Sequence, residues 1–371
     1  MRPVQAEIEM RRRTFLQGAA ASGVAALSAP AIARQGFTLR QKAARMLLMG
    51  FIGDNMETDG AAAIAGHLES GRIGGVLFLR HNVRSRDGVE GMTAHFRSIA
   101  PDAWMAVDQE GGAVQRLSGD LGYSPIPRAY VISEEQTVEE ARDIYRAAAI
   151  EFRDAGFNLN LAPVADVQDD ENGVIGRWGR GYGADGERIA EYAGAFIEAF
   201  ESVGAACSIK HFPGHGRSSG DSHHGFVDIT ESWSEAELDP FRRLINAGQA
   251  HLIMGGHLTH IGLDPAGDPV TFSRPILTDL LRGQMGFRGA LVTDDLDMGA
   301  IHENYDQREA VIRSIQAGND MIMMSNSAAP DPELPIRFAD WIEAAVANGE
   351  LTESRIEESM ARLDVLAARS I

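Results

Sequence analysis

Residues 210–224, KHFPGHGRSSGDSHH, form the densest cluster of ionisable side chains in this sequence. The segment holds four histidines, a lysine and an aspartate, and its glycines and proline predict a long mobile loop. Two kinds of chemistry fit it. In one, Asp221 orients His223 for acid and base catalysis. In the other a metal ion is bound, with these ligands available: His211, His215, His223, His224, His257 and His260. No HExxH motif occurs, which weakens the metal hypothesis.

Lys210 opens that segment and is one of only two lysines, with Lys42, among 34 basic residues. A lysine is a compact point charge, whereas arginine offers a planar fork. Its position directly after an apolar run predicts a cation at the end of a strand. Pairing with a nearby carboxylate for structural reasons is the alternative.

The segment VTDDLDM at residues 292–298 places Asp294 and Asp295 side by side after another apolar run. Neighbouring side chains on an extended strand point in opposite directions, so only one carboxylate can face a central pocket. That carboxylate can act as a nucleophile, and the other can cap the next helix. A capping role for both is the structural alternative.

The elements that would position these residues follow a repeating pattern. Short runs rich in Val, Ile, Leu and Met predict eight strands at 46–52, 75–79, 104–107, 159–164, 207–209, 251–254, 290–293 and 320–324. Amphipathic stretches predict helices at 136–155, 188–203, 235–247, 274–285, 307–317 and 353–368. Apolar strands alternating with helices require a parallel sheet covered on both faces. We therefore expect a single-domain (β/α)8 TIM-type barrel, with an open doubly wound sheet as the alternative.

Chemistry in such barrels gathers where strands end in loops. Polar residues follow five of the predicted strands: Asp108, Gln109 and Glu110; Lys210 and His211; His257; Asp294 and Asp295; Ser325 and Asn326. This arrangement predicts one shared polar pocket.

Charge and composition limit the partners. The chain has 371 residues, and 53 acidic against 34 basic side chains give a net charge of −19. An acidic surface repels phosphate, so we expect no nucleic acid partner. The lone Cys207 cannot form an internal disulfide, which suits an oxidising compartment. The oligomeric state is left open.

Residues 1–33 have the composition of a signal peptide. RRRTFLQ at 11–17 precedes small and apolar residues and an A-x-A site ending at Ala33, a pattern typical of twin-arginine export. The apolar part is too short to span a bilayer, so the mature protein, residues 34–371, should carry no integral membrane segment. We therefore expect a periplasmic or secreted protein. A short amphipathic helix is the alternative.

Four blocks in the same order carry a family resemblance: DQEGGAVQRL at 108–117, LAPVADV at 161–167, KHFPGHG with a following DSH at 210–223, and TDDLDM at 293–298. They resemble glycoside hydrolase family 3, in particular its single-domain β-N-acetylhexosaminidase branch. The resemblance implies an enzyme that removes terminal β-linked N-acetylglucosamine from carbohydrate substrates with retention of configuration, through a covalent glycosyl-enzyme and without metal or cofactor. Peptidoglycan-derived and chitin-derived oligosaccharides are the expected substrates.

The resemblance also implies residue roles. Asp294 corresponds to the nucleophile, and His223, oriented by Asp221, to the general acid and base. The implied substrate contacts are Asp108, Arg116, Arg180, Lys210 and His211. Arg177 is the weaker candidate beside Arg180, because VIGRWGRGYG at 174–183 carries about two more residues than the family pattern. Alternatives in other classes are a β-glucosidase or β-N-acetylglucosaminide phosphorylase, a zinc-dependent barrel hydrolase, and a non-catalytic sugar-binding protein.

Overall fold

The computed structural model describes residues 36–168, 173–218, 220, 225 and 227–370. Contacts divide the chain into Met1–Phe37 and Thr38–Ile371, and the fold described below is that of the second unit. The predicted signal peptide, Asp221 and His223 lie outside the described residues, so the boundary after Ala33 and the Asp221–His223 pair stay predictions.

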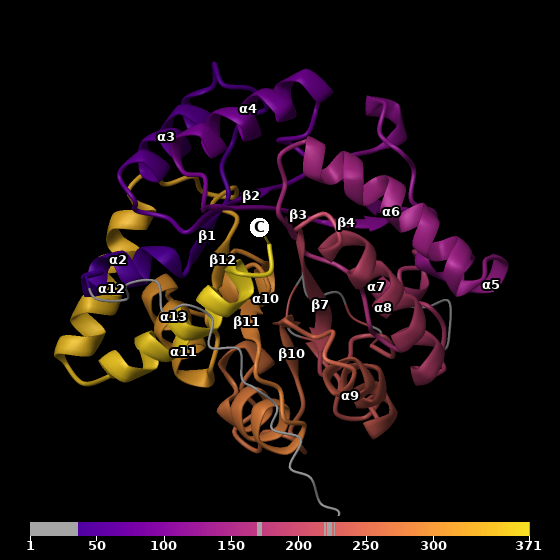
Figure 1. Cartoon of the computed structure of the whole chain (residues 1–371). Coiled ribbons are helices and arrows are strands. Elements are labelled where there is room, and N and C mark those ends of the chain that lie inside the picture. The colour runs from indigo at the N-terminus through magenta and orange to yellow at the C-terminus, as the bar shows by residue number, and fades with distance from the viewer. Residues whose placement is uncertain (1–35, 169–172, 219, 221–224, 226, 371) are drawn as a thin grey trace, which may run out of the picture. The chain divides into compact units, whose positions relative to one another are not determined.

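Eight parallel strands form the centre of the molecule (Figure 1). They are β1 (Leu47–Met49), β2 (Gly75–Phe78), β3 (Trp104–Val107), β6 (Leu159–Asn160), β7 (Ala206–Phe212), β9 (Leu252–Gly255), β11 (Ala290–Thr293) and β12 (Ile322–Met324). From β1 to β11 each strand pairs with the next in this order, and β1 also pairs with β12. A parallel bridge between Val292 and Met321 links β11 to β12 and closes the ring. The predicted barrel is confirmed, and the open sheet is wrong.

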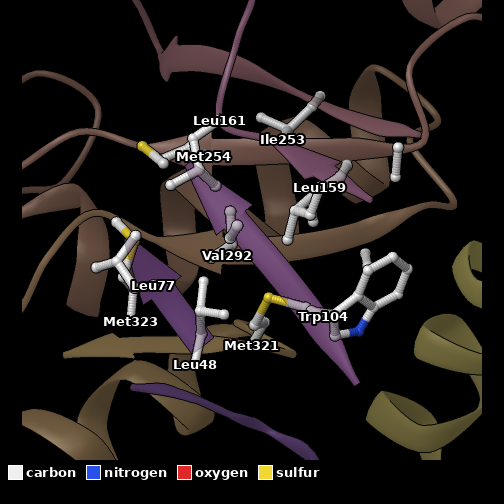
Figure 2. Close-up of a cluster of buried hydrophobic side chains, with 14 of the residues drawn as sticks. Leu48, Leu77, Trp104, Leu159, Leu161, Ile253, Met254, Val292, Met321 and Met323 are labelled. Atoms are coloured by element: carbon white, nitrogen blue, oxygen red, sulfur yellow. The ribbon is translucent and has the colours of Figure 1, made fainter. Parts of the chain in front are cut away.

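The barrel interior is filled by apolar side chains. Figure 2 shows Leu48, Leu77, Leu159 and Val292, from four different strands, gathered in one cluster. These side chains are fully or almost fully buried. The strands are covered on both faces, so they need continuous apolar sequence, and this is why every predicted run overlaps a strand. The strands β1 and β6 are shorter than the predicted runs 46–52 and 159–164.

Helices surround the strands (Figure 1). The α-helices are α2 (Leu39–Arg45), α3 (Asp59–Glu69), α4 (Arg86–Ile99), α5 (Ala129–Glu135), α6 (Val138–Asp154), α7 (Gly173–Gly176), α8 (Gly186–Glu201), α9 (Asp239–Asn246), α10 (Gly299–His302), α11 (Gln307–Ala317), α12 (Leu334–Ala347) and α13 (Glu353–Ala367). A π-helix spans Pro275–Gln284, and short 3-10 turns span Gly119–Leu121, Glu235–Leu238 and Val270–Phe272. All six predicted helical stretches are helical.

Helix starts follow capping chemistry that the sequence carries. Thr137 begins α6 with a capping box, because its hydroxyl accepts from the backbone of Glu140 and the Glu140 carboxylate accepts from the backbone of Thr137. The Asp306 carboxylate accepts from the first amides of α11, whose bounds agree with the predicted 307–317. Among the described residues no helix is long and apolar enough to cross a membrane.

Strand β7 is longer than predicted. It runs to Phe212, so Lys210 and His211 are buried strand residues, and the prediction that the loop begins at residue 210 was wrong. The reason lies in the neighbouring segment 161–167. The Lys210 amide donates to the Pro163 carbonyl at 3.1 Å, and the Lys210 carbonyl accepts from the Ala165 amide at 2.7 Å. These two bonds continue the backbone pairing of β7 beyond the apolar residues 207–209.

Candidate active site

A cluster of opposite charges lies beyond the carboxyl end of β3. Lys210 Nζ donates to Asp108 Oδ1 and to Glu110 Oε1, each at 2.7 Å. Arg180 binds both oxygens of Glu110, with its Nε and Nη2 each 2.8 Å away. Asp108 follows β3, Glu110 lies in β4 (Gln109–Gly111), and Arg180 follows α7. The fold thus brings together residues up to 102 positions apart.

These charges stabilise one another because they are shielded from water. Burial alone would raise the pKa of Glu110, but Arg180 and Lys210 outweigh it and hold that pKa well below its usual range. Burial would likewise lower the pKa values of Lys210 and Arg180, but Asp108 and Glu110 raise that of Lys210, and Glu110 raises that of Arg180. All three groups are therefore ionised at neutral pH.

Asp108 is the partly accessible member of the cluster. Its side chain is 17% exposed, against 5% for Glu110 and 4% for Lys210. Arg116 Nη2 lies 3.5 Å from Asp108 Oδ2. The hairpin of β4 and β5 (Val114–Gln115) presents Arg116 there, because the Gln109 side-chain oxygen accepts from the amides of Arg116 and Leu117 at 3.0 Å. The polar groups available to a ligand here are thus Asp108 and Arg116, whose side chain is 16% exposed, whereas Glu110 is buried.

A second buried carboxylate holds the predicted contact His211. Asp166 is fully buried, and its Oδ2 accepts from His211 Nδ1 at 2.7 Å. Its Oδ1 accepts from the amides of His211 and His215 at 3.0 and 2.9 Å. Burial would raise the pKa of Asp166, but His211 lowers it. Because Asp166 occupies Nδ1, the Nε2 of His211 is the ring nitrogen left for a ligand.

The adjacent carboxylates after β11 have different surroundings. The Asp295 Oδ1 accepts from the amides of Ser325 and Asp297 at 2.8 and 3.1 Å, as expected for the member that turns to the backbone. Burial and then the Asp297 carboxylate raise the pKa of Asp295 to about 7. Asp294, the predicted nucleophile, is half-buried and accepts from the Asp295 amide at 2.9 Å. Its catalytic role stays a prediction.

Of the other histidines proposed as metal ligands, His224 lies outside the described residues, and His215, His257 and His260 have protein partners. The His215 Nδ1 lies 2.5 Å from the Ser218 hydroxyl. His257 Nε2 donates to the Asp295 carbonyl at 2.8 Å, and its Nδ1 lies 2.6 Å from the Thr271 hydroxyl. His260 Nδ1 accepts from the amides of Gly262 and Leu263 at 3.1 Å. In the part of the chain that the structure describes, no three acidic, histidine or cysteine side chains are grouped as metal ligands would be.

The structure also separates the two arginine candidates. Arg180 is in the charge cluster, whereas Arg177 is exposed and its guanidinium lies over the Trp178 ring, 5.2 Å from its centre. Glu110 was predicted only as one of the polar residues of the shared pocket, with no role of its own. Two further buried carboxylates near these residues, Asp166 and Glu237, were not proposed as site residues. Glu110 and Asp166 stood inside the quoted motif blocks, which was the available signal. Nothing in the sequence marked Glu237.

Glu237 lies against the segment that follows β7. It is buried at 1% exposure, and a Cβ placed on Gly214 would lie 2.3 Å from its Oε2. Its Oε2 is buried and has no hydrogen-bond partner among the described residues. Burial and then the Asp166 carboxylate raise the pKa of Glu237 to about 8. Residues 213–217 therefore pack against the Glu237 carboxyl group, which is largely protonated at neutral pH.

Comparison with known proteins identifies the class. Residues 38–366 match the glycosyl hydrolase family 3 N terminal domain. A beta-hexosaminidase of Pseudomonas aeruginosa (strain LESB58) is 36% identical over 261 residues, which are 69% of this chain and 76% of the relative. The beta-hexosaminidase LpqI of Mycobacterium tuberculosis is 35% identical over 268 residues, which are 70% of this chain and 66% of LpqI.

Solved structures give the same assignment. The family 3 β-N-acetylglucosaminidase of Paenibacillus sp. str. FPU-7 superimposes with a TM-score of 0.81 at 31% identity, over 90% of this chain and 63% of that one. Mycobacterium tuberculosis LpqI gives a TM-score of 0.76 at 30% identity, over 90% of this chain and 94% of LpqI. The chain belongs to glycosyl hydrolase family 3, as the motif blocks predicted. It is a glycoside hydrolase.

Proposed function

We propose that this enzyme is a retaining exo-β-N-acetylglucosaminidase acting through a covalent glycosyl-enzyme. The observation that carries the proposal is the cluster of Asp108, Lys210, Glu110 and Arg180, which surrounds one accessible carboxylate with fixed charges. It lies at the carboxyl ends of the strands, the face on which barrel enzymes bind substrate. The beta-hexosaminidases and the β-N-acetylglucosaminidase that resemble the chain support the choice of sugar.

In the first step the Asp294 carboxylate attacks the anomeric carbon and the glycosidic C–O bond breaks. His223, oriented by Asp221, gives its proton to the departing oxygen. In the second step water loses a proton to His223 and attacks the same carbon, which frees Asp294. Two inversions at one carbon give net retention.

The remaining predicted residues bind the sugar in this proposal. Asp108 accepts hydrogen bonds from sugar hydroxyls, while Arg116, Lys210 and His211 donate to sugar oxygens. Arg180 acts on the same subsite, since it holds Glu110 against Lys210. Preset charges of this kind cost little reorganisation as charge develops in the transition state.

The test of the reaction is a panel of p-nitrophenyl glycosides with the full chain. We expect cleavage of the N-acetylglucosaminide, with the glucoside and galactosaminide much slower, and no increase on adding phosphate or loss on chelation. Proton NMR of the first product should show the β-anomer. Phosphate-dependent turnover, a preference for the glucoside, or an α-anomer would overturn the assignment.

Two variants test the residue roles. Asp294→Ala should lower kcat by at least about 10³-fold on every substrate, as expected on losing a nucleophile. His223→Ala should lower it more on a glycoside with a poor leaving group than on an activated aryl glycoside, because only the poor leaving group needs the proton. Equal losses on both substrates would remove the acid role from His223.

We also propose that the enzyme is exported and processes wall-derived or chitin-derived oligosaccharides outside the cytoplasm. The support is the arginine-rich segment at residues 11–17 with the small residues ending at Ala33. Arg12→Lys and Arg13→Lys together, which replace the arginine pair directly before Thr14, should keep the protein in the cytosol and uncleaved. A cytosolic, uncleaved wild-type chain would overturn this proposal.

A further inference from the structure

Among the tryptophans and tyrosines, two side chains stand out by their exposure. The chain has four tryptophans and six tyrosines, all within the described residues. Tyr130 and Trp178 are each 43% exposed, and all the others are buried or half-buried. Exposing a large aromatic ring to water is unfavourable in free energy. Where such rings gather on a surface, they often mark a site that binds a ligand or another protein.

The two exposed rings come from segments that are far apart in sequence but in contact. The Tyr130 amide donates to the Gly179 carbonyl at 3.2 Å. Gly179 has a φ of +60°, and a Cβ there would lie 3.5 Å from the Tyr130 Cβ and 3.4 Å from the Arg128 Cδ. Trp178 is therefore the chain neighbour of a residue that packs on Tyr130.

Both residues lie on the side of the barrel that holds the charge cluster. Tyr130 belongs to the connection between β3 and α6, and Trp178 to the connection between β6 and α8, so both follow carboxyl ends of strands. Arg180, which binds Glu110, is two positions from Trp178, which limits the separation of their Cα atoms to about 7 Å. A disaccharide that reached the cluster would extend over a distance of this order.

We propose that Trp178 and Tyr130 form a subsite for the leaving-group sugar, the ring on the reducing side of the bond that is cleaved. A pyranose ring presents a face of C–H groups that packs on an aromatic ring, while its hydroxyls stay in water. The Arg177 guanidinium over the Trp178 indole steadies that ring and offers donors beside it. This inference rests on the proposed function and adds a preference for sugar aglycones.

The test compares N,N′-diacetylchitobiose with methyl β-N-acetylglucosaminide, whose single-carbon aglycone cannot stack. Trp178→Ala should lower kcat/KM for the disaccharide about tenfold, mainly through KM, and Tyr130→Ala about threefold, in line with the loss of one aromatic contact. Both variants should cleave the methyl glycoside at the wild-type rate. Trp178→Phe should recover most of the loss, because it restores a ring without restoring the indole.

Trp341→Ala is the matched control, because Trp341 is a half-buried indole of α12 that also lies beside an arginine, Arg337, at 5.8 Å. It should leave the ratio of the two substrates unchanged. Equal losses on both substrates, or none, in Trp178→Ala would overturn the subsite while leaving the proposed function intact. A wild-type enzyme that cleaves neither substrate would overturn the proposed function and this inference with it.

Discussion

Each end of the barrel holds a buried carboxylate surrounded by cations, but the two networks differ in what they leave accessible. After β3, Glu110 forms ion pairs with Arg180 and Lys210. Lys210 also pairs with Asp108, whose side chain is 17% exposed. Before β12, Asp320 is fully buried. Its oxygens accept from Arg282 at 2.7 Å, Arg355 at 3.1 Å, Arg362 at 3.0 Å, Ser359 at 2.8 Å and the Leu291 amide at 3.1 Å.

The difference shows how one kind of interaction serves two purposes. Around Asp320 every partner is a protein group, so the network joins the π-helix and α13 to the barrel and leaves nothing for a ligand. Around Glu110 the chain of charges ends in a carboxylate that water or a substrate can reach. Burial of ions is costly unless they are paired, and both networks meet that condition. Only the accessible end can do chemistry.

Replacing Asp320, the carboxylate whose partners are all protein groups, should have the largest effect on stability. Asp320→Asn would leave three arginines around a neutral side chain, and we expect the free energy of unfolding to fall by about 3–5 kcal/mol. Urea unfolding measures the loss, and kcat/KM of the folded enzyme should be unchanged. Asp340→Asn is the control, since Asp340 pairs with Arg40 on the surface and should cost less than about 1 kcal/mol. If Asp320→Asn lowered kcat/KM without lowering stability, the purely structural role of the Asp320 network would be wrong.

Replacing Glu110, the buried carboxylate that pairs with Lys210 and Arg180, should act mainly on catalysis. Glu110→Gln would weaken the hold on Lys210 and Arg180, and we expect kcat/KM to fall about 100-fold through misplacement of these cations and Asp108. Glu90→Gln, which removes a partner of Arg86 on α4, serves as the control. Activity within about twofold of wild type would mean that Glu110 plays no part in positioning.

Glu237 extends the comparison to a carboxyl group whose folded-state pKa is raised. The pKa rises from 4.5 to about 8 on folding, so the unfolded chain releases this proton at lower pH than the folded one. Between these two values this group lowers stability as pH rises, by about 1.4 kcal/mol per pH unit. Glu237→Gln lacks that dependence and should gain on wild type between pH 5 and pH 8 in urea unfolding. Glu235→Gln, an exposed neighbour, should follow wild type, and parallel curves for Glu237→Gln would disprove the raised pKa.

The smallest effect on stability is expected from replacing Ser359, the neutral side chain in the network around Asp320. Ser359 donates to Asp320 Oδ1 alongside Arg355 and Arg362. Ser359→Ala should therefore cost about 1 kcal/mol of stability, the contribution of one hydrogen bond to a carboxylate that keeps its other partners. Thermal unfolding measures this change. A cost as large as that of Asp320→Asn would show that the arginines do not compensate.

Much of the fold could be predicted because its signals are local. Apolar runs specify strands buried on both faces, and capping residues such as Thr137 and Asp306 mark helix starts. The end of β7 could not be predicted this way. Lys210 and His211 are polar, yet the Lys210 backbone pairs with residues 163–165. The Lys210 side chain pairs with the partly buried Asp108, and the His211 side chain pairs with the buried Asp166. Polar sequence ended the predicted strand too early.

The sequence by itself determined the barrel, the family and the candidate site residues Asp108, Arg116, Arg180, Lys210, His211 and Asp294. It did so because strand periodicity and motif blocks depend on neighbouring residues. Only the tertiary structure decided that Glu110 joins Arg180 to Lys210, that Asp166 holds His211, and that Tyr130 meets the segment of Trp178. These contacts join residues at least 45 positions apart, so they exist only once the barrel has closed.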